Sequence, residues 1–109
     1  KEWIKEENPF TKEFILKLHN EFYSTDLEEF LEITHKNKTF RMTPGQIRTQ
    51  DVQVGKHIAP KAEDLDYLLN TFENLYRFDN QKRLLSEKII YSVSAHHRLL
   101  WIHPFLDGN

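Results

Sequence analysis

The stretch His103–Asn109, HPFLDGN, gathers several groups that could do chemistry. The imidazole of His103 has an ordinary pKa of about 6.5, so it can act as a general base near neutral pH. The carboxylate of Asp107 is a hard oxygen ligand of the kind that Mg²⁺ prefers. Gly108 lets the backbone approach an anion closely, and Asn109 lies where a following helix would offer free N–H groups to a phosphate. A base, a metal ligand and an anion site so close together are suited to phosphoryl or nucleotidyl transfer.

A long helix is predicted to position His103. Residues of one predicted helix face recur at helical spacing before it, namely Leu85, Ile89, Val93, His96 and Leu100. We expect this helix to end at about Trp101 or Ile102, because Pro104 disfavours the α conformation of the residue before it. The imidazole is therefore expected at a rigid position, followed by a tight loop that Phe105 anchors to the core.

Three further helices are predicted. The first runs from about Pro9 to Tyr23, after an Asn-Pro cap, with an apolar face formed by Phe14, Ile15, Leu18 and Phe22. A shorter helix follows the capping-box pattern that begins at Asp26 and fades in the polar run 35–38. The third starts near Pro60, where acidic residues suit the positive end of the helix dipole, and it has a broad apolar face.

A short β-hairpin is predicted between these helices. A turn signal at 43–45 precedes β-prone residues over 47–54, and Gly55-Lys56 interrupts the run before 57–59. Two strands this short must lie on a helical body and leave an edge exposed. The predicted fold is therefore mainly α, with one domain over 1–109. An exposed edge is a liability unless another chain is meant to pair with it.

Composition excludes several other kinds of protein. Lysine and arginine number 15 against 17 acidic residues, interspersed along the chain, so no nucleic-acid-binding patch is predicted. Cysteine is absent, which excludes a thiol nucleophile and a cysteine zinc site. No apolar run reaches the roughly 20 residues that a membrane span requires, and no signal peptide is visible. We expect no membrane contact and a cytoplasmic location.

The stretch His103–Asn109 resembles the signature of the Fic domain family, His-Pro-Phe-x-Asp/Glu-Gly-Asn, which in most members continues Gly-Arg-x-x-x-Arg. The Leu-His at 18–19 resembles that of the family's early helix. Residues 44–48 resemble the Pro-Gly-x-x-Arg that opens the family's β-hairpin "flap", and 52–60 resembles the flap itself. The resemblance implies a Fic-type helical bundle that reaches the catalytic loop, with the C-terminal part of the domain beyond Asn109.

What the resemblance implies is transfer of AMP from ATP to a Ser, Thr or Tyr hydroxyl of another protein. His103 would be the catalytic base, Asp107 would hold Mg²⁺, and ATP would be the co-substrate. Residues assigned by the resemblance to nucleotide binding are Phe105, Gly108 and Asn109. Without the arginines of the continuation, the chain ending at Asn109 is expected to bind ATP poorly and to be inactive as an isolated fragment.

The flap would receive the target protein by addition of a strand to its open edge. The residues expected to bind the target are Val52, Gln53, Val54, Gly55, Lys56 and His57. Many family members also carry an inhibitory Ser/Thr-x-x-x-Glu-Gly/Asn helix. The nearest match, Ser24 to Glu28, is followed by Glu29, so any inhibition is expected to come from outside this chain, from an inhibitory helix or antitoxin acting in trans.

Two alternatives to AMP transfer remain open. One is a non-catalytic module that docks peptides on the flap. The other is Fic-type transfer of UMP, phosphocholine or phosphate, although Gly108, which the kinase-like branch usually replaces, favours AMP. Among the remaining candidates, His19 is interpreted as a hydrogen-bonded core residue, His96 as a packing residue, and Arg48 as a residue that holds the flap.

Overall fold

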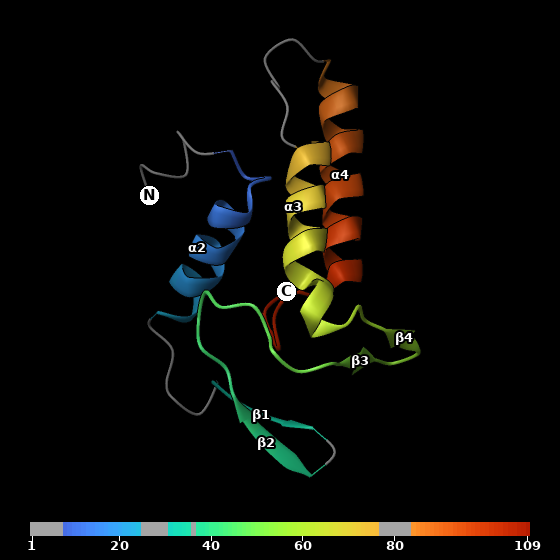
Figure 1. Ribbon diagram of the computed structural model, residues 1–109. Helices are drawn as coiled ribbons and strands as arrows, with labels where there is room; N and C mark the ends of the chain where they lie inside the picture. Colours follow the sequence, from blue (N-terminus) through green and yellow to red (C-terminus); the bar gives the residue numbers. More distant parts are fainter. Residues whose placement is uncertain (1–7, 25–30, 36, 77–83) are drawn as a thin grey trace.

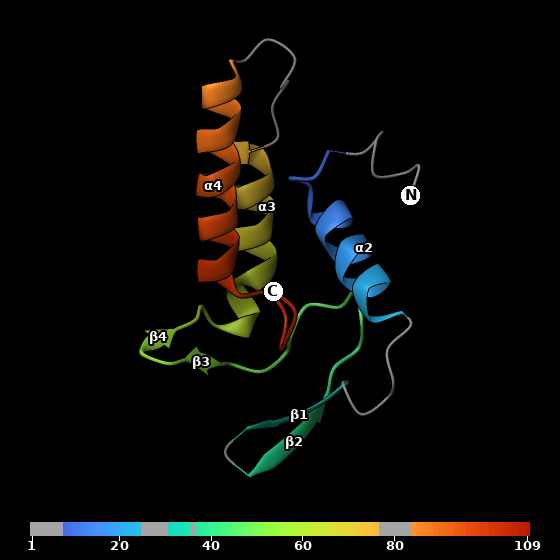
Figure 2. The same ribbon diagram turned by 180° about the vertical axis from the view of Figure 1, so that it is seen from behind.

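The computed structural model describes residues 8–24, 31–35, 37–76 and 84–109. Its elements, in chain order, are α2 (Lys12–Tyr23), β1 (Glu32–His35), β2 (Lys38–Arg41), β3 (Gln53–Val54), β4 (His57–Ile58), the 3₁₀ turn η2 (Ala62–Asp64), α3 (Leu65–Tyr76) and α4 (Leu85–Ile102). Figure 1 shows α3 and α4 side by side, with α2 alongside them and both hairpins near the C-terminal end of α4; Figure 2 gives the reverse view. The fold is mainly α with a short hairpin, as predicted, and it has a second antiparallel strand pair.

Helix α2 begins later than predicted and buries a different face. Thr11 is its N-cap, and the Thr11 hydroxyl accepts a hydrogen bond from the N–H of Phe14 at 3.2 Å. The sequence had suggested Asn8 as the cap, but the Asn8 side chain instead holds a turn through the N–H of Phe10. Of the predicted apolar face, Phe14 and Ile15 are buried, whereas Leu18 and Phe22 are exposed. His19 and Tyr23, at helical spacing from Ile15, are buried in their place.

Helix α3 forms the centre of the core. The Asp51 carboxylate caps the chain just before it, accepting a hydrogen bond from the N–H of Ala62 at 2.8 Å. The α3 side chains pack with one residue of α2, two of α4 and the aromatic ring that follows α4. The buried core cluster consists of Ile15, Leu65, Leu69, Phe72, Ala95, Ile102 and Phe105. The core therefore holds the end of α4 and the loop after it against the other helices.

Helix α4 has the predicted bounds, but the predicted stripe does not face the core. Leu85, Ile89 and Val93 are 74%, 55% and 64% exposed, and His96 is exposed as well. The residues buried on α4 are Ala95 and Ile102. Apolar spacing identified a helix face, but the sequence alone could not show which face α3 would cover. No helix in the described part of the chain is long and apolar enough to cross a membrane.

The predicted flap is present as the β3–β4 hairpin, with Gln53 opposite Ile58 and Val54 opposite His57. Gly55 at its tip has a φ of 61°, which glycine adopts readily. Strand structure does not extend back to 47–52 as the β-prone residues had suggested. The N–H of Arg48 bonds instead to the carbonyl of Pro104, at 2.9 Å, so this segment is tied to the loop after α4.

A second hairpin, β1–β2, was not predicted. It pairs Glu32–His35 with Lys38–Arg41, and its turn contains Asn37 with a φ of 63°. The sequence analysis expected a helix fading into a polar turn at 35–38, so it located the turn but missed the strands on both sides. The start of that predicted helix lies outside the described residues. The alternation Ile-Thr-His before the turn and Lys-Thr-Phe after it was the available signal.

Candidate active site

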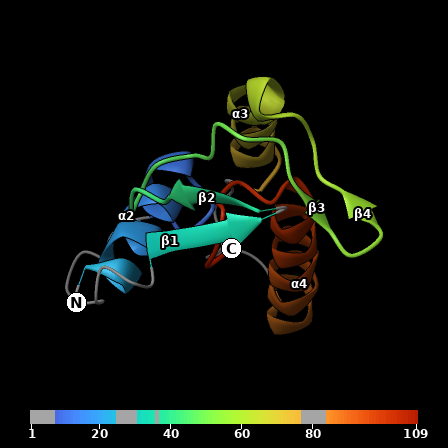
Figure 3. The same ribbon diagram turned by 90° about the horizontal axis from the view of Figure 1, so that it is seen from below.

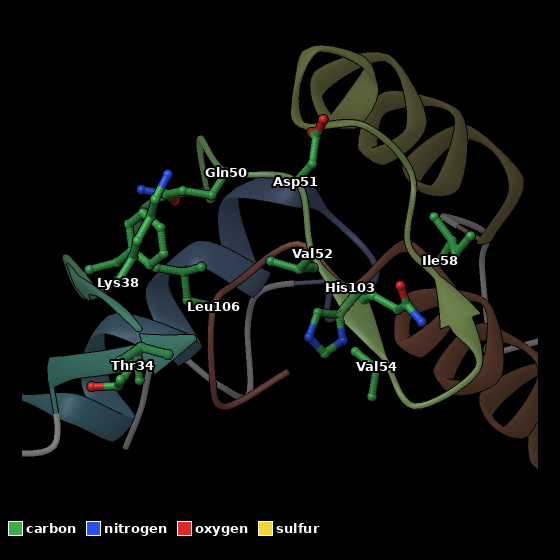
Figure 4. A pocket seen from close by; sticks show the side chains of 12 residues that line it. Thr34, Lys38, Gln50, Asp51, Val52, Val54, Ile58, His103 and Leu106 are labelled. Carbon is green, nitrogen blue, oxygen red and sulfur yellow. The ribbon is translucent and has the colours of Figure 1, made fainter. Parts of the chain in front are cut away.

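His103 occupies a strained position at the end of α4. Its backbone has φ 53° and ψ 64°, in the left-handed region, and its N–H still bonds to the carbonyl of Leu99 at 3.0 Å. Pro104 disfavours the α conformation of the residue before it, so the helix ends at Ile102, as the sequence predicted. Left-handed geometry is unusual for a residue with a side chain. It turns the chain sharply and leaves the half-buried imidazole of His103 beside the flap (Figure 4).

The hydrogen bonds of Asn109 define the protonation state of this imidazole. The Asn109 side chain accepts from the N–H of Phe105 at 2.6 Å and donates to the carbonyl of Phe105 at 2.7 Å, which fixes its orientation. Its amide nitrogen also lies 3.1 Å from Nε2 of His103. Because an amide nitrogen only donates, this contact favours the neutral tautomer in which Nε2 accepts and Nδ1 carries the proton.

Burial lowers the pKa of His103 below its ordinary value, and electrostatic interactions with Arg48 and His57 lower it further, while Asp107 opposes these effects. A histidine with a lowered pKa is mostly neutral at pH 7. The hydrogen-bond geometry and the electrostatics therefore agree. His103 is held in the form that accepts a proton.

Phe105 anchors the loop to the core. Its side chain is 2% exposed, and its ring stacks on that of His19, with centroids 3.7 Å apart and planes 12° from parallel. Nδ1 of His19 accepts from the N–H of Gly45, and Nε2 donates to the carbonyl of Asp107, both at 2.9 Å. His19 is thus the hydrogen-bonded core residue that the sequence indicated, and burial lowers its pKa.

The carboxylate of Asp107 is exposed and oriented by Tyr23, whose hydroxyl donates to Oδ2 at 2.9 Å. No group of three or more potential ligand side chains gathers within the described ranges, so the protein by itself offers no closed metal cage there. Mg²⁺ does not need one, since it binds through one or two carboxylates and completes its shell with water and substrate phosphate. Asp107 therefore has the chemistry of a single carboxylate ligand, with Oδ2 bonded to Tyr23.

Gly108 is required by two features of the loop. Its φ is 71°, and a Cβ added there would lie 2.6 Å from the ring and the hydroxyl of Tyr23. No larger residue fits without moving the tyrosine. The same tyrosine therefore packs against Gly108 and orients Asp107. Tyr23 was missed as a site residue because its spacing on α2 matched a helix face and nothing local connected it to the distant loop.

Arg48 joins the flap segment to the catalytic loop. The residue is 4% exposed, and its guanidinium donates to the carbonyls of His103, Gln50 and Pro60, each at 2.7 Å. A longer contact of 3.4 Å reaches the carbonyl of Ile102. These partners include carbonyls at the end of α4. Such carbonyls have no N–H partner within the helix, so they need donors from elsewhere. The sequence suggested that Arg48 holds the flap, but it gave no sign that Arg48 also holds the backbone of His103.

The flap residues divide between the site and the solvent. His57 bonds through Nε2 to the carbonyl of Trp101 at 2.9 Å, which attaches β4 to the end of α4. Val52, Gln53 and Val54 line a cleft beside His103, whereas Gly55 and Lys56 lie outside its lining and are exposed. In the part of the chain that the structure describes, β3 pairs only with β4, so its other edge has no strand partner.

The cleft has a volume of about 470 Å³ and lies between the flap and the β1–β2 hairpin. Figure 4 shows the imidazole of His103 with Val52 and Val54 on the flap side, and Lys38 and Thr34 on the side of the other hairpin. Seen from below, the end of α4 lies between the two hairpins (Figure 3). The imidazole of His103 thus faces a cleft whose volume exceeds that of a single side chain.

A comparison with protein-family profiles matches residues 9–109 to the Fic/DOC family. The chain belongs to the Fic/DOC family. This confirms the family that the sequence resembled. In this Fic/DOC chain, the signature residues His103 to Asn109 form the loop just described, and its flap is the β3–β4 hairpin.

Curated relatives of this Fic/DOC chain are named protein adenylyltransferase Fic. The Aedes aegypti relative is 36% identical over 86 residues, which cover 76% of this chain and 17% of the relative. The Culex quinquefasciatus relative has the same identity and coverage. The Drosophila persimilis relative is 31% identical over 104 residues, covering 86% of this chain and 20% of the relative. The chain therefore spans about a fifth or less of the length of these relatives.

Proposed function

We propose that the protein transfers AMP from ATP to a hydroxyl side chain of a protein target, as the names of its relatives indicate for them. The observation that carries the proposal is the imidazole of His103 at the edge of a cleft, with Asn109 bonded to its ring and Arg48 bonded to its backbone carbonyl. A general base must be unprotonated at working pH and within reach of the proton that it removes. His103 meets the first condition, and the cleft gives a hydroxyl access to it.

In the proposed reaction, Nε2 of His103 takes the proton of the target hydroxyl once Asn109 is displaced from that nitrogen. The hydroxyl oxygen forms a bond to the α-phosphorus of ATP, the bond from that phosphorus to the bridging oxygen breaks, and pyrophosphate leaves. Asp107 is the residue that would hold Mg²⁺, which supplies charge neutralisation for the phosphates when bound. Phe105 would keep the loop in place, and the backbone at Gly108 and Asn109 would receive the phosphates of the nucleotide.

The flap supports the proposal that the target is an extended protein segment. The free edge of β3 offers backbone N–H and C=O groups to another strand, and Val52 and Val54 flank that position beside His103. Strand addition fixes which residue of the target lies next to the imidazole. His57 keeps the flap attached to α4 while this happens. Inhibition in trans stays a prediction, as does the cytoplasmic location, which cell fractionation tests.

The test is the intact mass of the full-length protein and of candidate targets after incubation with ATP and Mg²⁺. We expect a mass gain of one AMP, and loss of a positioned base lowers such a rate by roughly 10²- to 10⁴-fold. His103→Ala is therefore expected to remove the gain. His97→Ala is the matched control, because His97 is an exposed histidine of the same helix. Undiminished transfer by His103→Ala would rule out the role given to this residue.

The same experiment decides between the alternatives. Replacing ATP by UTP, CDP-choline or a nucleotide with a labelled γ-phosphate tests transfer of UMP, phosphocholine or phosphate. A gain with one of these and none with ATP would change the transferred group and leave the base in place. Absence of transfer with every co-substrate, together with peptide binding by the flap, would support the non-catalytic docking module.

A further inference from the structure

The β1–β2 hairpin forms the wall of the cleft opposite the flap. Ile33 and Phe40 are directly paired across the two strands, so their side chains share one face of the hairpin. Both line the cleft and are partly buried. With Val52 from the flap segment and Leu106 from the catalytic loop, they make much of the lining between the two walls apolar.

The hairpin is a tethered element rather than a loose extension. Met42, directly after β2, is 3% exposed, and its N–H bonds to the carbonyl of Leu31, directly before β1, at 2.6 Å. This bond closes the base of the hairpin. At the other end, Asn37 adopts the left-handed conformation that tight turns require. The hairpin is therefore closed at its base and joined to the body of the protein through the buried Met42.

The wall also carries a positive charge. Lys38 lines the cleft, and Figure 4 shows its side chain on the side away from His103. Within the described ranges, no acidic side chain forms an ion pair with Lys38. Asp51 is the other charged residue with a fixed sign in the lining, and its carboxylate already accepts the N–H of Ala62. A ligand in this cleft would thus meet an unpaired ammonium group at the end remote from the base.

The cleft volume indicates how many side chains of a target segment could occupy it. Sites that bind ligands measure about 300–1,000 Å³, and this cleft, at about 470 Å³, lies within that range. The hydroxyl side chain beside His103 would occupy only part of it. The remainder is lined by Ile33 and Phe40, which suit an apolar side chain, and ends at Lys38, which suits an acidic one.

We propose that the β1–β2 hairpin is a second target-binding element that selects the residues around the modified hydroxyl. Its occupant is an extended segment of a protein target. A large apolar side chain of that segment packs against Ile33 and Phe40, and an acidic side chain lies near Lys38. The inference rests on the proposed function, because it describes the segment that presents its hydroxyl to His103.

The test measures docking separately from chemistry. An array of nine-residue peptides with a central Ser, Thr or Tyr is incubated with the full-length protein, and retention of the protein is quantified for each peptide. We expect retained peptides to share a large apolar residue and an acidic residue on the same side of the hydroxyl. Burial of such an apolar side chain changes affinity by roughly 10- to 100-fold, so Phe40→Ala is expected to weaken retention by about that factor.

Charge reversal gives the sharper result, because it should switch the preference and not only weaken it. Lys38→Glu is expected to favour peptides with a basic residue at the position where the wild type favours an acidic one, by about fivefold. Lys61→Glu is the matched control, since Lys61 is an exposed cation outside the cleft lining. Its preference should equal that of the wild type. Circular dichroism of each variant shows that the fold is retained.

The outcomes separate this inference from the proposed function. Selective retention that switches in Lys38→Glu supports the second element, whether or not AMP is transferred. Two outcomes overturn the inference while the proposed function stands. One is AMP transfer that does not depend on the residues next to the hydroxyl. The other is a peptide preference that is unchanged in Phe40→Ala and Lys38→Glu. A higher KM for ATP in these variants, with the peptide preference unchanged, would assign the cleft to the nucleotide and also overturn it.

Discussion

Replacing Arg48 is expected to loosen the catalytic loop and to destabilise the protein. In Arg48→Ala, the carbonyls of His103, Gln50 and Pro60 each lose a donor at 2.7 Å. Hydrogen bonds to a charged group contribute about 1.5–3 kcal/mol each. The three are not additive, and water enters the vacated space, so we expect the free energy of unfolding to fall by about 3–5 kcal/mol. Urea denaturation followed by circular dichroism measures this change.

Two further variants make the test specific to the guanidinium. Arg48→Lys keeps the charge but has one donor nitrogen in place of a planar fork, so it should lose roughly half as much as Arg48→Ala. Arg98→Ala removes an exposed arginine that lies over the ring of Trp101 at 5.7 Å, and it should cost less than about 1 kcal/mol. If Arg48→Ala unfolds within about 1 kcal/mol of the wild type, the role given to Arg48 is wrong.

The pKa of His103 provides a readout that general destabilisation would not produce. The positive charge of Arg48 lowers this pKa. Arg48→Ala should therefore raise it toward the ordinary value of about 6.5, and Arg48→Lys should raise it less. Titration of the imidazole resonances by NMR in the folded variants measures the shift. An unchanged pKa in Arg48→Ala would show that the charge of Arg48 does not reach the base.

Two other predictions concern the loop and its support. Gly108→Ala should lower the free energy of unfolding by about 1–3 kcal/mol, because its Cβ would lie 2.6 Å from Tyr23. Gly55→Ala is the control: a Cβ there meets nothing within 4 Å, so it should cost only the backbone strain of about 1 kcal/mol. Equal losses of stability in thermal melts of the two variants would contradict this prediction. The pKa of His19 is lowered by burial, so the unfolded chain binds its proton more tightly. Its contribution to stability is complete above about pH 6.5 and is lost as the pH falls through the folded pKa. His19→Gln should reduce this pH dependence in urea denaturation, and an unaltered pH dependence would exclude His19 as its source.

The helices and the signature loop could be predicted from local sequence. Helical spacing and Pro104 determine where α4 ends, and the turn residues around Gly55 determine where the flap reverses direction. These signals act between residues close in the chain. The bounds of α4 and the location of the flap were therefore correct.

What the sequence could not show depends on contacts between distant residues. Tyr23 bonds to Asp107, and Arg48 to His103, across the whole domain, and no spacing rule relates these pairs. The stripe that begins at Leu85 is apolar, but Ala95 is small and lies on the buried face, so composition pointed to the wrong side of α4. The β1–β2 strands were missed because a capping box and apolar residues just before them resembled a helix.

The end of α4 serves as the common support of the reactive group and of the surfaces around it. The carbonyls of Trp101, Ile102 and His103 accept hydrogen bonds from the side chains of His57 and Arg48, so the attachment of the flap depends on these two side chains and on main-chain atoms of α4 that every amino acid supplies. Side chains at the flap tip and along β1–β2 can therefore change during evolution while the base stays in place. Under the proposed function, a lineage could acquire new targets by substitution at these surfaces while His103 and its supports stay unchanged.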